Sequence, residues 1–284
     1  MKNLLTTFFF LGATLYATAQ TADDKVVIPD GWNKTGQIIF LFNQSAFNKE
    51  WQGGGLSSYS GNLSINYSFN YKKNDLVWDN KILGVYGLAK INGAARAVKS
   101  DDRLEFTSLV GKKARGYWFY SGFVNFQSQF DSGFNAVGVR TSHAFSPAYL
   151  QAGPGMLWKK SNTLFVNIAP ATTRLIYVDK QFTAFGPSFG VEKGETTRVE
   201  FGASVGAYYK TNLMENISFE NILNLYSNYL DKPQNVDVNY QMNLVMKVNK
   251  SISANLAFQT IYDDNAVKAV QVRQVFGLGL NYGF

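Results

Sequence analysis

Long stretches of this chain alternate between apolar and polar residues. The clearest is "NVDVNYQMNLVMKVNK", residues 235–250: from Val236 to Asn249 apolar side chains occupy the even positions, and polar side chains occupy the odd positions except at Val245. A period of two is that of a β-strand, whose successive side chains point to opposite faces. The stretch is also much longer than an average strand of about 5–6 residues. It therefore predicts a long strand with one polar and one apolar face.

The same alternation recurs along the chain. It is strong at residues 62–71, 198–209, 252–259 and 276–284, and weaker at 36–47, 75–91, 101–110, 115–130, 147–160, 162–170 and 214–229. Together these segments make about twelve strands. Tight turns at 72–75, 111–115, 159–162, 210–216 and 249–251 alternate with mostly longer links at 48–55, 92–100, 131–146, 171–196, 230–235 and 263–270. An even strand number and alternating short and long connections are typical of outer-membrane barrels.

The predicted fold is therefore all-β, a transmembrane antiparallel β-barrel with short periplasmic turns and longer extracellular loops. A secreted β-sandwich or jelly roll is the alternative, but the strands of a sandwich seldom reach this length. We expect the apolar face to contact lipid through Tyr240, Met242, Leu244, Met246, Val248, Leu278, Leu280, Tyr282 and Phe284. We expect the lumen to be lined by Arg103, Glu105, Arg198, Glu200, Glu220, Asn224, Asp237, Asn239, Gln241, Asn243 and Lys247. Charges of both signs there form either a neutralising network or a narrow polar path.

The first residues predict export. "MKNLLTTFFFLGATLYATAQ" has a charged start, a short apolar run and a small-x-small cleavage site, so residues 1–19 are expected to be a signal peptide. Residues 20–35 are then a periplasmic lead-in, and residues 36–284 form the barrel. The chain has no cysteine, which excludes a lipoprotein anchor and thiolate metal sites. The expected location is the outer membrane of a Gram-negative bacterium.

The net charge of +7 does not indicate nucleic-acid binding. Many basic residues fall in the expected short turns, where they would ring the periplasmic mouth beside lipid headgroups. The expected partners are outer-membrane lipid and the barrel-assembly machinery, which would read the terminal Phe284. The oligomeric state is left open.

The sequence contains only weak candidates for chemistry. His143, in "RTSHAFSP", is the single histidine, and Ser142 or Ser146 is a conceivable nucleophile beside it. No Asn or Asp is evidently placed to orient that imidazole. The acidic pairs Asp101–Asp102 and Asp263–Asp264 lie near expected outer strand ends and are weak candidates for a cation site, without a Ca²⁺-loop spacing. No cofactor is expected.

Several motifs resemble a family of proteins of unknown function from Bacteroidetes-type bacteria, domain-of-unknown-function 3078. They are "FNKEWQGGGLSSYS", "YKKNDLVWDN", "KSDDRLEFTSLVGKKA", "WFYSGFVNFQSQF", "FSPAYLQAGPGMLWKK", "FGVEKGE", "YSNYLDKPQNVDVNY" and "NKSISANLAFQTIYDD", and they span nearly the whole mature chain. The resemblance implies an outer-membrane barrel and supplies no activity, ligand or catalytic residue.

The leading functional hypothesis is a narrow pore or passive channel for small solutes. The alternatives are a closed structural or adhesion barrel that acts through its outer loops, and, with less support, a lipid-modifying enzyme centred on His143. About twelve strands leave the width of the bore undecided. The long segment 171–196 is a candidate plug.

Overall fold

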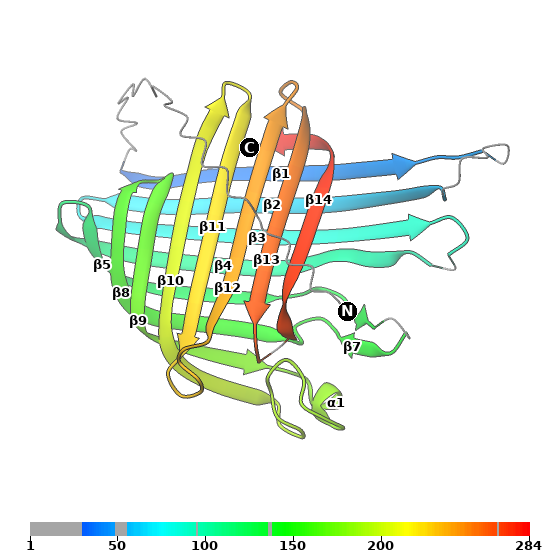
Figure 1. Cartoon of the computed structure of the whole chain (residues 1–284). Helices are drawn as coiled ribbons and strands as arrows, with labels where there is room; N and C mark the ends of the chain where they lie inside the picture. The colour runs from blue at the N-terminus through cyan, green and yellow to red at the C-terminus, as the bar shows by residue number, and fades with distance from the viewer. Residues whose placement is uncertain (1–29, 49–55, 95, 136–137, 266) are drawn as a thin grey trace, which may run out of the picture.

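The protein folds into a closed antiparallel barrel (Figure 1). The structure is a computed structural model that describes residues 30–48, 56–94, 96–135, 138–265 and 267–284. Its barrel strands are β1 (Gly31–Ser45), β2 (Ser58–Lys73), β3 (Leu76–Ile91), β4 (Val98–Arg115), β5 (Trp118–Ser128), β8 (Ala148–Ser161), β9 (Leu164–Tyr177), β10 (Thr197–Met214), β11 (Ile217–Asn228), β12 (Val236–Lys247), β13 (Ile252–Asp263) and β14 (Val267–Gly283). A hairpin of β6 (Gly133–Phe134) and β7 (Arg140–Ser142) and a short helix, α1 (Lys180–Thr183), lie in the connections.

Each barrel strand pairs with its neighbours in sequence, apart from the β6–β7 hairpin, which is an excursion between β5 and β8. Pairing of β1 with β14, from Gln37–Gly283 to Phe42–Leu278, closes the sheet. Closure pairs the backbone groups that an open edge would leave unsatisfied in lipid. In Figure 1, β1–β4 run across the picture behind the steeper β10–β13, so the front and back walls cross.

The predicted all-β barrel of about twelve strands is confirmed, with differences at strand ends. β1 begins at Gly31, so residues 31–35 belong to the barrel and not to a lead-in. β9 continues to Tyr177 and β14 begins at Val267, which shortens the expected links 171–196 and 263–270. The end of β9 was not predicted because its pairing with both β8 and β10 shifts register near Ala169 and Thr172. This shift interrupts the alternation from which the strand was predicted.

The outer surface of the barrel is apolar, as lipid contact requires. Leu278, Leu280, Tyr282 and Phe284 are each about 60 % exposed. Aromatic rings gather at the short-turn end, where the centroid of Trp32 lies 5.2 Å from that of Tyr71 and 5.6 Å from that of Trp78. Such rings at one rim match an interfacial girdle.

Two further observations concern the remaining chain. The expected signal peptide and most of the expected lead-in lie outside the described residues. Within the described ranges, no helix has the length and apolar character needed to cross a membrane.

Candidate functional site: the barrel lumen

A hydrogen bond crosses the middle of the barrel. Arg103, on β4, donates from Nη1 to Oε1 of Gln241, on β12, over 2.8 Å. The two strands are six positions apart whichever way the barrel is followed, so they face each other across the lumen. This bond therefore spans the lumen.

Part of the lumen, beside β2, β13 and β14, is packed. Asn62, Ser253 and Asn255 are each at most 6 % exposed, and the Asn255 amide donates to the Ser253 hydroxyl over 2.6 Å. Gly279 faces this group because a Cβ there would lie 2.4 Å from the Asn255 amide nitrogen. An ion pair between Arg273 and Asp101 adds a second cross-barrel contact. Side chains therefore fill this part of the lumen.

A cavity of about 800 Å³ is lined mainly by β4, β5 and β8–β12, and also by residues of β2, β3, β13 and β14. Its wall combines polar side chains with aromatic rings, including Phe123, Tyr149, Phe165, Phe189 and Tyr226. A second cavity of about 600 Å³ lies at the short-turn end. The two share the lining residues Ser68, Asn70, Lys81, Asn162 and Tyr208. The two cavities therefore adjoin inside the barrel.

Charges at the outer end of the larger cavity, which are buried or half-buried except for Asp231, form an alternating chain. Arg174 contacts Asp237 at 2.5 Å and Glu200 at 3.4 Å, and Arg198 contacts Glu200 at 2.8 Å and Asp231 at 3.3 Å. Glu200 is only 1 % exposed. A buried carboxylate is costly unless it is paired, and two guanidinium groups supply that pairing here.

Paired charges also occupy the inner end. Lys159, on β8, contacts Asp79, on β3, at 2.5 Å. Glu220 accepts hydrogen bonds from the Tyr208 hydroxyl at 2.7 Å and from the Asn243 amide at 3.0 Å. These contacts connect the wall strands below the cavity.

The residues expected in the lumen fall into three groups. Glu105, Asn224, Asp237, Asn239 and Gln241 line the larger cavity and Glu220 lines the smaller one. Arg103, Asn243, Arg198 and Glu200 join the networks described above. Lys247 differs, because it is the exposed last residue of β12 at the barrel mouth.

The residues expected to face lipid follow the apolar parity of β12 and β14. Tyr240, Met242, Leu244 and Met246 are partly exposed along β12. Val248 lies one residue beyond β12, in the turn to β13, so it does not belong to the strand face. The β12 turn starts earlier than the sequence pattern suggests because Val248 and Asn249 both donate to the Ile252 carbonyl.

The acidic pairs are arranged differently from the cation sites considered in the sequence. Asp101 pairs with Arg273, whereas Asp102 accepts a hydrogen bond from Lys99 at 2.7 Å. Consecutive strand residues point to opposite faces, so these two carboxylates do not form one site. Asp263 and Asp264 instead lie beside Asp237, which sequence reasoning placed only in the lumen wall.

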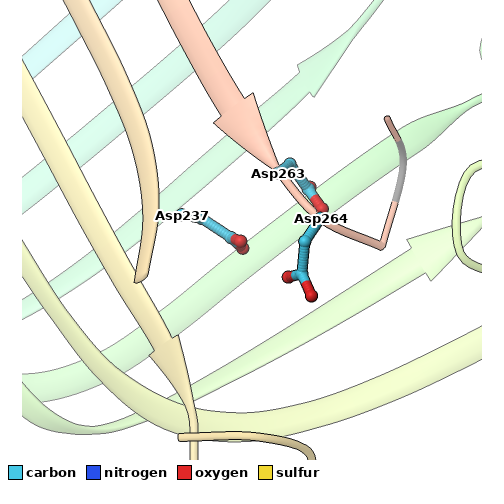
Figure 2. A group of neighbouring side chains, drawn as sticks. All are labelled: Asp237, Asp263 and Asp264. Atoms are coloured by element: carbon cyan, nitrogen blue, oxygen red, sulfur yellow. The ribbon is translucent and has the colours of Figure 1, made fainter. Parts of the chain in front are cut away.

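Figure 2 shows this group, Asp237, Asp263 and Asp264, at the outer end of β12 and β13. One carboxylate oxygen of each lies within 4.8 Å of the others. The β12–β13 register pairs Val238 with Tyr262, which brings Asp237 opposite Asp263. Counting equal numbers of residues along both strands from the turn at residues 249–251 would have predicted that Asp237 and Asp263 lie opposite each other.

His143 is bound in the outer loops. Its Nδ1 lies 2.7 Å from the Ala144 carbonyl oxygen and its Nε2 lies 3.2 Å from Asp179 Oδ2. The expectation that no acid orients the imidazole is therefore wrong: Asp179 does, although it is 36 residues away in sequence. The Ser146 hydroxyl is fully buried and accepts from the Asp179 amide. Neither ring nitrogen faces a serine hydroxyl, so the arrangement does not activate a serine nucleophile.

Asp179 also caps α1. Its carboxylate accepts from the Gln181 amide at 2.9 Å, and this bond, with a further contribution from His143, holds the pKa of Asp179 below its usual range. The loop between β9 and β10, residues 178–196, is anchored by buried Val178 and Val191. Its Pro187, Ser188 and Phe189 line the larger cavity, so part of the segment proposed as a plug does reach the lumen.

Comparisons with known proteins agree with this architecture. Residues 42–134 match the family described as "Protein of unknown function (DUF3078)". That stretch contains the first four of the eight motifs named above, so the family resemblance is confirmed there. No curated protein matches the chain.

Solved structures share the barrel at low identity. The COG4313 outer membrane channel from Pseudomonas putida F1 is 12 % identical, with a TM-score of 0.40 over 92 % of this chain and 97 % of that chain. The translocator domain of the autotransporter NalP from Neisseria meningitidis is 9 % identical, with a TM-score of 0.37 over 91 % and 90 %. The outer membrane channel DcaP of Acinetobacter baumannii is 10 % identical, with a TM-score of 0.35 over 89 % and 97 %.

Those likenesses concern architecture alone. The closed antiparallel barrel, its exposed apolar face and its aromatic rim are the features of an outer-membrane β-barrel. The chain is therefore a transmembrane β-barrel of the outer-membrane type.

Proposed function

We propose that this protein is a narrow passive channel for small solutes in the outer membrane. The observation that supports it is the pair of cavities that adjoin at five shared residues, one lined mainly by β4, β5 and β8–β12 and the other at the short-turn end. A structural barrel needs no such space, since its interior can be filled, as the part around Asn255 is.

Planar-bilayer recording of the purified, refolded protein tests this proposal. We expect discrete steps of small conductance. Phe189→Ala should enlarge them, because Phe189 lines the cavity where the loop 178–196 reaches it. Phe185→Ala is the matched control, since Phe185 is on the same loop and 95 % exposed. A folded barrel that carries no current would refute the channel, and equal effects of both substitutions would place the path elsewhere.

A second candidate function is favoured by the outer loops, which are tied to one another. Besides the contact of His143 with Asp179, Arg140 donates to the Gln181 side chain at 2.5 Å. A fixed loop surface suits a barrel that binds envelope or host components. Binding that survives substitutions in the lumen and disappears on trimming the loop 178–196 would support this function instead.

We further infer that residues 1–19 direct export and are removed, and that the assembly machinery reads the C-terminal strand. In support, Phe284 is 59 % exposed on the lipid face and its ring centroid lies 6.1 Å from that of Tyr67. N-terminal sequencing of the membrane-inserted protein tests the cleavage. A chain that still begins at Met1 would refute it.

A further inference from the structure

Negative charge is concentrated at the outer end of the larger cavity. Arg174 is bound to Asp237 and Glu200, and the carboxylates of Asp263 and Asp264 lie within 4.8 Å of that of Asp237. Asp237 and Asp263 line the cavity, and so does Glu105 farther in. Inside a barrel such charges are screened less than on an exposed surface, so they attract cations strongly.

The aromatic walls of the cavity are a second and independent feature. Two cations of the protein are already seated on these rings. The guanidinium carbon of Arg174 lies 3.7 Å from the centroid of the Tyr226 ring, and Lys159 Nζ lies 5.9 Å from that of Phe165. The face of an aromatic ring attracts cations, and the attraction grows when both are removed from water. Tyr149 and Phe189 add further rings to the same wall.

The cavity also has the dimensions of a small-molecule site. Its volume of about 800 Å³ lies within the range of about 300–1,000 Å³ for ligand pockets, which combine apolar walls with a few polar groups. Leu83, Leu109 and Phe123 supply apolar side chains on β3–β5, strands that are not neighbours of β12 and β13, which carry Asp237 and Asp263. A ligand with an apolar body and a cationic head would match this division.

We propose that the larger cavity binds small organic cations that carry an apolar group, such as an arylalkyl ammonium. The ammonium group lies near Asp237 and Asp263, and the apolar body lies against the aromatic wall. This inference rests on the proposed channel function only in that the site would lie on the solute path. It names the class of solute that the channel would select.

Equilibrium binding tests the proposal without depending on conductance. Isothermal titration of the folded barrel in a non-ionic detergent would use phenethylammonium, with phenylacetate as the anionic match and phenethyl alcohol as the neutral one. Titration of detergent alone corrects for partitioning. We expect the cation to bind at least tenfold more tightly than either match.

Charge-neutral variants locate the site. The double variant Asp263→Asn, Asp264→Asn should weaken phenethylammonium binding about tenfold, and its amides can still accept from Asn265 and Asn235, as the carboxylates do. If that variant fails to fold, the single variant Asp263→Asn provides the test, because Asp263 lines the cavity beside Asp237. Glu192→Gln, on the exposed part of the loop 178–196, is the control.

The outcomes separate the two proposals. A barrel that binds phenethylammonium but carries no current would refute the channel and keep the site. A conducting barrel that binds all three probes equally, or whose variants bind phenethylammonium unchanged, would overturn the site and keep the channel. Binding of Ca²⁺ without any binding of phenethylammonium would also overturn it, because the carboxylates would then serve a metal ion.

Discussion

Substituting Leu244 by arginine would place a charge on the outer face of the barrel. Leu244 is near the inner end of β12, and its partners across the two neighbouring strands are Phe219 and Leu256. An arginine there finds no acid or amide directly beside it on that face. Its guanidinium group must remain in hydrocarbon, thin the bilayer locally or extend toward the headgroups.

The depth of Leu244 sets the expected cost. It precedes Lys247, the last residue of β12, by three positions. At a rise of about 3.3 Å per residue and a tilt of about 40°, this places it about 8 Å inside that end of the strand. The apolar band is about 25 Å tall, and an arginine costs about 2–4 kcal/mol at its midplane but about 0–1 kcal/mol at its edges. We therefore expect Leu244→Arg to lower the free energy of unfolding by about 2 kcal/mol.

The adjacent residue is the matched control. Asn243 points into the lumen, where its amide donates to Glu220 at 3.0 Å. An arginine at this position meets a carboxylate in place of lipid, so Asn243→Arg should change the free energy of unfolding by less than about 1 kcal/mol. The two substitutions add the same side chain one residue apart.

Urea unfolding from phospholipid vesicles, followed by tryptophan fluorescence, measures both changes. The chain has five tryptophans to report the transition. Equal losses of stability for the two variants, or a larger loss for Asn243→Arg, would refute the inward and outward assignment of β12.

Three further predictions concern the lumen, the barrel wall and the outer loops. Arg174→Met should lower the free energy of unfolding by about 3–5 kcal/mol, measured by the same urea titration, because it leaves buried Glu200 with less compensation. Gly202→Ala should prevent assembly of the barrel, measured as a heat-dependent shift in gel mobility, since its Cβ would lie 1.8 Å from a carbonyl oxygen of β11. Gly206→Ala is the control and should assemble, because the nearest atom to its Cβ would lie at 3.4 Å. The pKa of Asp179 is lowered in the folded loop, so its ionised carboxylate stabilises the loop at pH values above the unfolded pKa. This stabilisation is lost as the pH falls below about 4. Asp179→Asn should therefore remove this pH dependence from hydrogen exchange of the loop.

Alternation alone predicted the strands because lipid leaves few choices for each side chain. In β12 the apolar parity must face hydrocarbon and the polar parity must face inward, so Asp237, Asn239 and Gln241 could be assigned without coordinates. β9 does not keep one alternation along its whole length. Its register shift near Ala169 and Thr172 moves the inward positions from odd to even numbers, and sequence reasoning consequently placed Arg174 in a loop.

Which lumen residues meet is a separate problem, because it depends on how the walls cross. Pairing between neighbouring strands follows from turn length, but Arg103 reaches Gln241 over six strands, and no local pattern encodes that distance. It is set by the tilt of the strands around the whole barrel. Any path through this lumen would therefore depend on barrel closure, whereas many of the charges on the lumen wall are already readable in the alternation.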